Sequence, residues 1–346
     1  MKQKVLFIGD CALGNETTNG VSAKNHFLLK RLQAVCDDVI NIDTANWKRR
    51  PKVLLKLLGV LVRYPEHNII ISLNTLSAYR FIKTINMFFP KRRLNYFVIG
   101  GILGHWLKTQ KLNRKPYGIV DHFMVETIKM KKEMAEAGFE NVITLPNFKD
   151  IPATLPQKHN HKGPVRFVFL SRIIPEKGCE YILDAIKLLN EEKLENKFCV
   201  NFYGVIDDNY KNHFEERLKF TPNAAYLGFM DLKEKENYQI LAENDVMLFP
   251  TYWSGEGFPG IIIDAYIAGL PIIATKWAHN EEVIKDGETG MLIPAHDVKS
   301  LCDKMLEAIT HPEKIARMSN ACQQEANNYH TDNILSETFL YKILGD

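Results

Sequence analysis

The sequence lacks the features that mark several common classes of protein. None of its apolar runs reaches the roughly 20 residues that a membrane-spanning helix needs. It has no low-complexity segment, and 46% hydrophobic with 25% charged residues is typical of a soluble globular protein. The opening residues, KQKVLFIGD, predict a β-strand and not a secretory signal peptide. We therefore expect a cytoplasmic protein, and its 346 residues are enough for two domains.

Patterns for metal and disulfide chemistry are also missing. The six cysteines are scattered without a Cys-x-x-Cys pair, which favours reduced core residues. No Asp-x-Asp motif and no histidine-rich cluster occurs, so we expect a functional site without a metal ion. We likewise expect no resident cofactor.

Charge is distributed unevenly along the chain. Residues 1–150 carry 24 Lys and Arg against 12 Asp and Glu, whereas the remainder carries 20 against 29. The net charge of +3 hides this difference. Such asymmetry suggests that the first half faces an anionic partner.

Short β-rich runs alternate with helical patterns in both halves. The expected strands are residues 4–10, 38–43, 68–73, 95–100, 122–127, 141–147, 164–172, 198–205, 224–229, 246–252, 271–275 and 290–294. Many are unbroken runs of Val, Ile, Leu and Phe, as in parallel strands covered on both faces. The polar, proline-containing stretch 150–163 predicts a linker.

This pattern predicts an α/β protein with two doubly wound, Rossmann-like parallel-sheet domains facing a cleft. The first domain is expected over 1–150 and the second over 164–325, with a C-terminal helix in 326–346 packing back toward the first. In such sheets ligands bind beyond the carboxyl ends of the strands. Residues at strand-to-helix junctions are therefore the candidates for function.

The segment SRIIPEKG (171–178) follows a predicted strand and opens a helix. It places Arg172 and Lys177 beside a helix N-terminus, which already attracts anions. An arginine fork and a lysine charge suit a diphosphate. The alternative is a pair of solvated charges at a turn.

The segment WSGEGFPGIIID (253–264) places Glu256 and Asp264 around a predicted helix start. Pro259 and Gly260 are expected to begin that helix, with exposed amides of residues 257–261 before and within its first turn. The two carboxylates are candidates for an acid/base pair, for metal ligands, or for hydrogen-bond acceptors of a polar ligand. Missing metal motifs elsewhere favour the last of these.

The first half contributes weaker signals. Loop 9–22 brings Gly14 and Gly20 to a helix N-terminus, where glycine permits close backbone approach, but it fits neither a dinucleotide nor a Walker motif. The segment VIGGILGHW (98–106) ends with His105 beyond a strand, for which structural and functional roles are both open.

Basic and apolar residues mix in stretches 48–65 and 80–93. They are equally consistent with helices covering the sheet and with contact to an anionic membrane surface.

The second half resembles the retaining glycosyltransferases of family 4, which have the GT-B fold. SRIIPEKG, PTYWSGEGFPGIIIDAYIAGLPIIAT and DGETGMLIP carry the resemblance. The first half is similar, more loosely, to bacterial members that build capsular or other surface polysaccharides.

This resemblance implies catalytic roles for four residues. Arg172 and Lys177 would hold the donor diphosphate, Glu256 would bind hydroxyls of the donor sugar, and His105 would approach that sugar. Asp264 occupies the second acidic position of the family's Glu-x7-Glu pattern, one methylene shorter, and would bind the ribose.

Other donor contacts are also implied by the resemblance. The amides of Gly257 and Phe258 would assist Glu256, and the nucleobase would lie against residues 227–229. The full set of further donor-binding residues is Gly20, Gly204, Gly228, Phe229, Gly257, Phe258, Pro259 and Gly260.

The function implied is transfer of a hexose from a UDP- or GDP-linked sugar, with retention of configuration and without a metal. The acceptor would be a glycan or a polyprenyl-diphosphate-linked glycan, at the inner face of the membrane or in the cytoplasm. A nucleotide-sugar epimerase on the same fold and a non-catalytic two-domain sugar-binding protein are the alternatives. Nucleic acid is not an expected partner.

Overall fold

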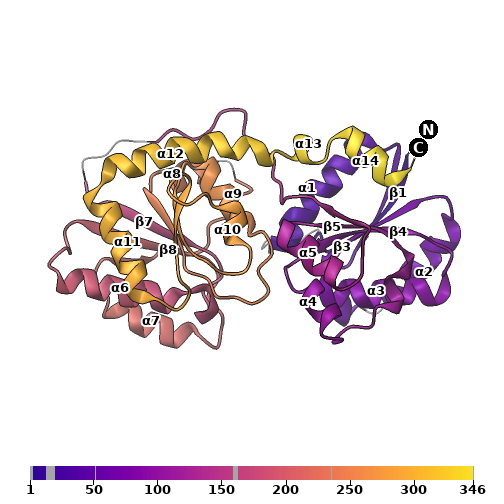
Figure 1. Cartoon of the computed structure of the whole chain (residues 1–346), viewed down its shortest axis with the longest axis horizontal. Helices are drawn as coiled ribbons and strands as arrows, with labels where there is room; N and C mark the ends of the chain where they lie inside the picture. The colour runs from indigo at the N-terminus through magenta and orange to yellow at the C-terminus, as the bar shows by residue number, and fades with distance from the viewer. Residues whose placement is uncertain (1–2, 13–19, 51, 159–162, 235, 346) are drawn as a thin grey trace. The chain divides into compact units, whose positions relative to one another are not determined.

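The computed structural model describes residues 3–12, 20–50, 52–158, 163–234 and 236–345. They form two compact units (Figure 1). Unit 1 comprises Met1–Asp150, Gly255–Gly260 and Tyr329–Asp346, and unit 2 comprises Ile151–Ser254 and Ile261–Asn328. The short segment 255–260 thus packs with unit 1 although its flanking residues belong to unit 2.

Unit 1 is built on a parallel sheet in the order β2-β1-β3-β4-β5-β6. Its strands are β1 (Lys4–Gly9), β2 (Asp38–Asp43), β3 (Asn68–Asn74), β4 (Leu94–Ile99), β5 (Val120–Val125) and β6 (Val142–Thr144). Leu6 and Ile8 of β1 enter one core cluster, whereas Val5 and Phe7 enter another. The sheet is therefore covered on both faces, as the apolar runs predicted.

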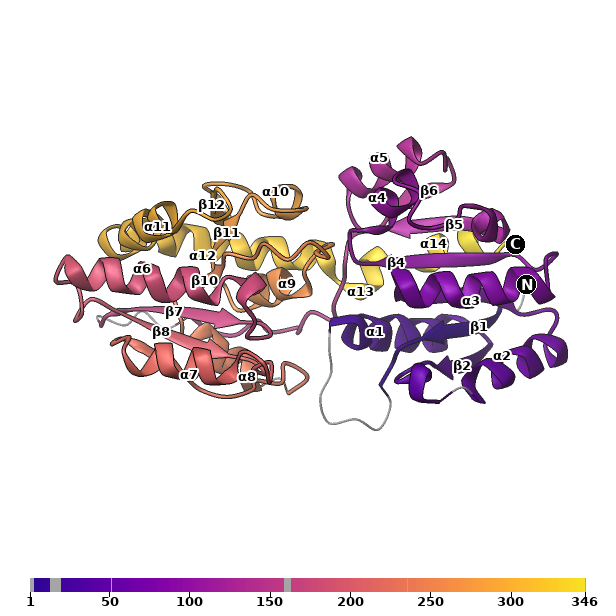
Figure 2. The same cartoon turned by 90° about the horizontal axis from the view of Figure 1, so that it is seen from below.

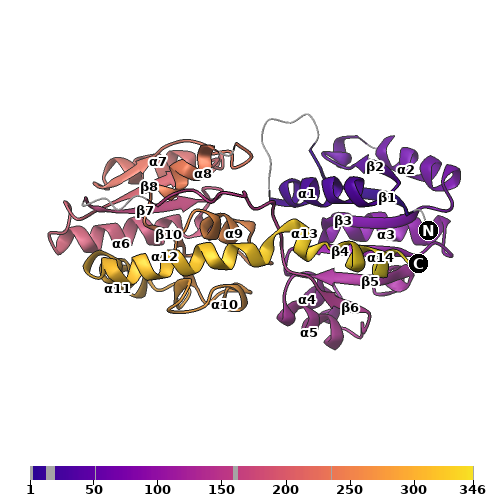
Figure 3. The same cartoon turned by 90° about the horizontal axis from the view of Figure 1, so that it is seen from above.

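Helices from both ends of the chain cover this sheet. They are α1 (Gly20–Val35), α2 (Lys52–Arg63), α3 (Thr75–Phe88), α4 (Leu103–Lys108), α5 (Ile128–Glu136), α13 (Thr331–Ile334) and α14 (Glu337–Leu344). Helices α2 to α5 share a cluster, and α1 packs with α14 on the opposite face. Figure 3 shows α14 beside β4, where Asn95 donates a hydrogen bond to the carbonyl of Ile343 (2.7 Å).

Unit 2 has a second parallel sheet, in the order β12-β11-β10-β7-β8-β9. Its strands are β7 (Val165–Leu170), β8 (Phe198–Tyr203), β9 (Ala224–Tyr226), β10 (Val246–Phe249), β11 (Ile272–Thr275) and β12 (Gly290–Ile293). All strand ranges predicted from the sequence overlap these twelve strands, so the predicted α/β class is confirmed.

The helices of unit 2 follow the same alternation (Figure 2). They are α6 (Cys179–Glu191), α7 (Lys211–Lys219), α8 (Glu236–Ala242), α9 (Gly260–Ile267), α10 (Asn280–Val283), α11 (Val298–Thr310) and α12 (Pro312–Ala326). Helix α9 begins in the 255–260 segment and continues in unit 2. Gly269, with φ +64°, lies just beyond its end, as expected for a left-handed helix terminus.

Strand order determines where a ligand can enter each sheet. In unit 2, β7 pairs with β10, so the connections that leave these neighbouring strands run in opposite directions. The corresponding position in unit 1 lies between β1 and β3. Crevices at such topological switch points are the usual ligand sites of open parallel sheets.

Within the predicted linker, residues 151–158 contain no helix or strand, and residues 159–162 lie outside the described residues. Among the helices of the described ranges, none has the length and apolar character that crossing a membrane requires.

Candidate donor-binding site

The turn after β7 presents two cations at the switch point of unit 2. Arg172 is exposed, and its guanidinium carbon lies 5.4 Å from the ring centre of Trp253. Lys177 is only 7% exposed, with its Nζ 5.7 Å from the ring centre of Phe249. Aromatic faces stabilise cations without neutralising them. The turn thus concentrates positive charge at the carboxyl edge of the sheet.

A glycine holds this turn against the loop that leaves β10. Gly178 has φ +85°, and a Cβ atom there would lie 2.2 Å from the carbonyl oxygen of Pro250. The carbonyl of Glu176 also accepts a hydrogen bond from the amide of Tyr252 (2.8 Å). Only glycine permits this approach, so the positions of Arg172 and the 251–253 loop are coupled.

An apolar surface lies at the carboxyl ends of β8, which pairs with β7, and of β9, which pairs with β8. Val205 follows β8, and Leu227 and Phe229 follow β9; their exposed fractions are 51%, 50% and 47%. Val205 is tied to the cationic turn because its carbonyl accepts the Ile173 amide at 2.9 Å. Adjacent apolar and cationic surfaces suit a ligand with a flat ring at one end and an anion at the other.

Gly204 and Gly228 shape this surface. The Gly204 amide donates to the Gly228 carbonyl at 2.9 Å. A Cβ on Gly204 would lie 1.8 Å from the carbonyl oxygen of Ser171, so no other residue fits there. Gly228 has φ +87° and stands in open space among the described residues.

Asp264 lies in the fifth position of α9 and is 3% exposed. Its Oδ1 accepts a hydrogen bond from the hydroxyl of Tyr238 on α8 at 2.6 Å. Burial, followed by the charge and hydrogen bond of Asp264, raises the pKa of Tyr238 far above its usual range. Tyr238 therefore stays a neutral donor, and the structure gives Asp264 a contact between helices that the sequence did not predict.

The segment 255–260 presents the other predicted carboxylate. Glu256 is 7% exposed, and the next two residues, Gly257 and Phe258, are buried. The Phe258 amide donates a hydrogen bond to Oε2 of Glu126 at 2.9 Å. The expectation of exposed amides over 257–261 is therefore wrong for Phe258, whose amide is bonded to a carboxylate of unit 1, and Gly257 is buried beside the same carboxylate.

Sequence reasoning missed Glu126 altogether. It follows β5 directly, in HFMVET, and is 5% exposed. Its other oxygen pairs with Nζ of Lys24 on α1 at 2.6 Å. The sequence feature that could have predicted it is an acidic residue at the carboxyl end of an apolar strand, since ligands of such sheets bind at that end.

Two more residues of unit 1 surround the segment. Asn147 donates to the carbonyl of Phe258 at 3.0 Å. The side chain of Lys149 lies near Gly260, with Cε 3.4 Å from where a Cβ would stand. Pro259, between them, is half-buried and precedes the first residue of α9.

Two of the predicted residues of the first domain lie on helices of unit 1, α4 and α1. His105 is exposed on α4, close enough to Glu133 of α5 to oppose the rise in pKa that burial causes in that carboxyl group. Gly20 is the exposed first residue of α1, and no described atom would contact a Cβ there. Gly14 lies outside the described residues.

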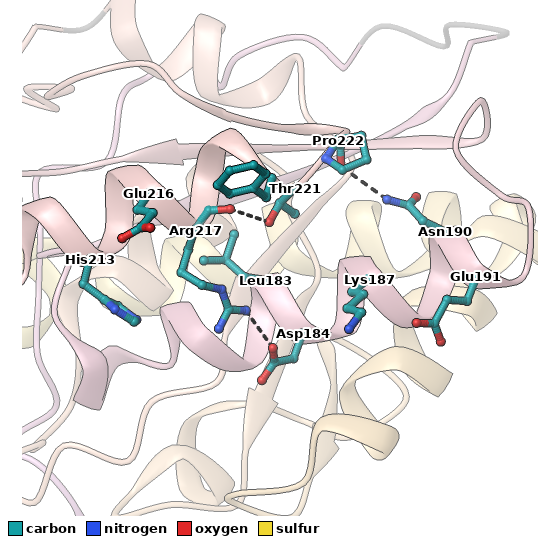
Figure 4. Close-up of a pocket in the computed structure, with 11 residues that line it drawn as sticks. Leu183, Asp184, Lys187, Asn190, Glu191, His213, Glu216, Arg217, Thr221 and Pro222 are labelled. Carbon is teal, nitrogen blue, oxygen red and sulfur yellow. Dashed lines mark hydrogen bonds and ion pairs between the residues drawn. The ribbon is translucent and has the colours of Figure 1, made fainter.

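A hollow of about 720 Å³ lies elsewhere in unit 2, between α6 and α7 (Figure 4). Two of its charged side chains, Arg217 and Asp184, form an ion pair at 2.7 Å. It extends to Glu191 at the C-terminus of α6 and Pro222 before β9, toward the amino ends of the strands. It is therefore separate from the carboxyl-edge residues.

Within the described ranges, no three His, Cys, Asp or Glu residues are grouped as ligands for a metal ion. A metal-free site stays a prediction.

The two Rossmann-like units together define the GT-B fold. Residues 164–311 match the family model described as Glycosyl transferases group 1, so the chain contains a domain of this family. The match includes the cationic turn, the apolar edge, Glu256 and Asp264.

Two bacterial proteins are similar to parts of the chain. The chain is 32% identical over 185 residues to an uncharacterized 41.2 kDa protein in the cps region of Klebsiella pneumoniae, covering 52% of this chain and 47% of that protein. It is 25% identical over 164 residues, 47% of this chain and 41% of the relative, to an Escherichia coli UDP-Gal:α-D-GlcNAc-diphosphoundecaprenol α-1,3-galactosyltransferase. The chain thus matches less than half the length of these curated relatives.

Solved structures agree with the fold over the whole chain. The crystal structure of Anabaena HepE in complex with UDP superposes with a TM-score of 0.76, covering 99% of both chains at 15% identity.

The Tyr238–Asp264 contact predicts that a variant without the Tyr238 hydroxyl is less stable than the wild type. Tyr238→Phe removes the donor to a buried carboxylate oxygen, so the free energy of unfolding should fall by about 1–3 kcal/mol. Urea denaturation measures it, with Tyr341→Phe at a partly exposed position as the control. An unchanged unfolding midpoint for Tyr238→Phe would show that the contact contributes nothing.

Proposed function

We propose that this protein is a glycosyltransferase that moves a sugar from a nucleotide-sugar donor to a glycan acceptor in bacterial surface polysaccharide synthesis. The proposal rests on the arrangement of residues at the carboxyl edge of the sheet in unit 2. There the turn that carries Arg172 is hydrogen-bonded, through the Ile173 amide, to Val205 of the exposed apolar surface, beside a topological switch point. The group 1 domain match and the glycosyltransferase relative support the same function.

Unit 2 binds the nucleoside diphosphate in this proposal. Arg172 and Lys177 neutralise the diphosphate, whose negative charge increases as the bond to the sugar breaks. The nucleobase lies against Leu227, Gly228 and Phe229, beside Gly204. UDP is the preferred nucleotide because UDP is named in the HepE complex and in the Escherichia coli relative, with GDP as the alternative.

Acidic residues bind hydroxyl groups of the donor. Glu256 accepts hydrogen bonds from the sugar hydroxyls, and Asp264, oriented by the Tyr238 hydroxyl, accepts one from the ribose. Pro259 and Gly260 set the start of α9 beside them. Gly20 and His105 remain candidates for contacts to the phosphates and the sugar.

The reaction proceeds with retention of configuration and without a metal or resident cofactor. The bond from the anomeric carbon to the diphosphate breaks, and the acceptor hydroxyl forms the new bond on the same face. The acceptor proton passes to an oxygen of the departing phosphate, so no protein nucleophile takes part. The protein contributes positioning and charge stabilisation. The α linkage named for the Escherichia coli relative supports retention, because an α-configured donor gives an α product when configuration is kept.

The acceptor is a glycan carried on a polyprenyl diphosphate, as the name of the Escherichia coli enzyme indicates for that protein. An epimerase or a non-catalytic binding protein is less well supported, because the matching family and the Escherichia coli relative are both described as glycosyltransferases.

A lipid-linked acceptor requires access to a membrane, and unit 1 has a surface of suitable chemistry. Leu55 and Val62 of α2 are 70% and 69% exposed, and Met87 and Phe88 at the end of α3 are 66% and 55% exposed. Exposed basic residues of the same stretches accompany them, namely Lys48, Arg49, Arg50, Lys52, Lys56, Arg63, Lys91 and Arg93. Apolar side chains among cations are typical of peripheral contact with anionic lipid.

The proposed donor site predicts that some variants weaken binding of the nucleotide, whereas others weaken binding of the sugar. Arg172→Ala and Lys177→Ala should each weaken UDP binding by about 10- to 100-fold, because each removes a charged contact to the diphosphate. Glu256→Ala should leave UDP affinity unchanged but remove the added affinity and turnover of the UDP-sugar. Isothermal titration with UDP and UDP-galactose, and release of UDP from UDP-galactose, measure both quantities. If UDP-galactose gives no signal, it is replaced by UDP-glucose, with UDP as the free nucleotide, and by GDP-mannose, with GDP as the free nucleotide.

Wild-type affinity in both cation variants would refute the diphosphate site. Loss of UDP affinity in Glu256→Ala would refute its assignment to the sugar.

The membrane contact predicts binding to vesicles that contain phosphatidylglycerol and weaker binding at high salt. Leu55→Ser with Val62→Ser should reduce the bound fraction in a co-sedimentation assay. Phe220→Ser, which changes an 81% exposed side chain in unit 2, serves as the control. Equal sedimentation with neutral and anionic vesicles would contradict the proposal.

A further inference from the structure

A buried ion pair in unit 1 is hydrogen-bonded to the backbone of the 255–260 segment. Lys24 Nζ lies 2.6 Å from Oε1 of Glu126, and their side chains are 5% and 4% exposed. Oε2 of the same carboxylate accepts the Phe258 amide at 2.9 Å. One carboxylate thus joins α1, the end of β5 and the segment that carries Glu256.

Such a pair is costly to bury, because both charges lose their hydration. The cost is offset only when the carboxylate finds hydrogen-bond donors on both oxygens. Here the second donor is a backbone amide 132 residues away in the sequence. Glu126 is therefore fully satisfied only when the segment is in place.

The Phe258 residue is held at both of its polar backbone groups. Glu126 accepts from its amide, and Asn147 donates to its carbonyl at 3.0 Å. Gly257 allows the close approach, because a Cβ there would lie 2.4 Å from Oε2 of Glu126. These contacts fix the backbone two residues after Glu256.

We propose that Glu126, charged and oriented by Lys24, is a positioning residue for Glu256. It does not touch the donor; it holds the backbone that presents the Glu256 carboxylate to the sugar. This inference rests on the proposed function, since it assigns to Glu126 a task in the binding of the donor sugar.

A double-mutant cycle tests it. Glu126→Ala should lower the rate of UDP release from the responsive nucleotide sugar by about 10- to 100-fold, because small displacements of a positioned group have effects of this size. Affinity for the free nucleoside diphosphate should stay within twofold of wild type. The double variant with Glu256→Ala should be no slower than Glu256→Ala alone, since Glu126 acts only through Glu256.

Conservative variants separate positioning from general stability. Glu126→Gln keeps an oxygen for the Phe258 amide and should recover part of the lost rate, whereas Lys24→Met should lose rate as Glu126→Ala does. Gly257→Ala should reproduce the Glu126→Ala defect by displacing the carboxylate, and it serves as the test if Glu126→Ala does not fold. Glu136→Gln, which breaks the exposed Lys108 pair in the same unit, should leave the rate unchanged.

The outcomes distinguish the two proposals. Wild-type turnover in Glu256→Ala overturns the sugar assignment and this inference with it. If turnover is slow in Glu256→Ala but wild-type in Glu126→Ala, this inference alone is overturned. If Glu126→Ala does not fold, wild-type turnover in Gly257→Ala has the same meaning. Additive losses in the double variant, or weakened nucleoside-diphosphate binding in a folded Glu126→Ala, also overturn it.

Discussion

The parallel pairing of β7 with β10 is the constraint on which the candidate site depends. Parallel strands place all their carboxyl ends on one edge, and the two connections that leave this pair diverge. The turn with Arg172 and the loop with Trp253 therefore face each other across the switch point, locked by Gly178. The stacked guanidinium and the neighbouring apolar edge follow from this geometry.

Contacts distant in sequence then refine the site. The 253–264 stretch divides between two environments: Asp264 is anchored inside unit 2 by Tyr238, whereas Phe258 is held in unit 1 by Glu126. Both carboxylates of the stretch are thus nearly buried. In the proposed function both act as hydrogen-bond acceptors and not as an acid/base pair, a role that Asp264 already has toward the Tyr238 hydroxyl.

Local pattern predicted the twelve strands because parallel, doubly covered strands are continuous apolar runs, and it placed Arg172 and Lys177 because turns follow strands directly. It could not predict which side chains would meet across the fold. The Tyr238 hydroxyl reaches a carboxylate 26 residues away, and Glu126 reaches an amide 132 residues away. For the same reason the expectation of an exposed Phe258 amide was wrong: its partner, Glu126, follows β5, far away in the sequence.

Trp253 offers the most direct test of the claim that a nucleoside diphosphate binds at the carboxyl edge of unit 2. Its ring lies under Arg172, so a diphosphate that draws the guanidinium toward itself should change the indole emission. The measurement is a fluorescence titration with UDP and GDP, in the wild type and in Trp253→Phe, which keeps three of the four tryptophans. We expect a saturable change with one nucleotide that disappears in Trp253→Phe. No change with either nucleotide, or the same change in the variant, would contradict this location.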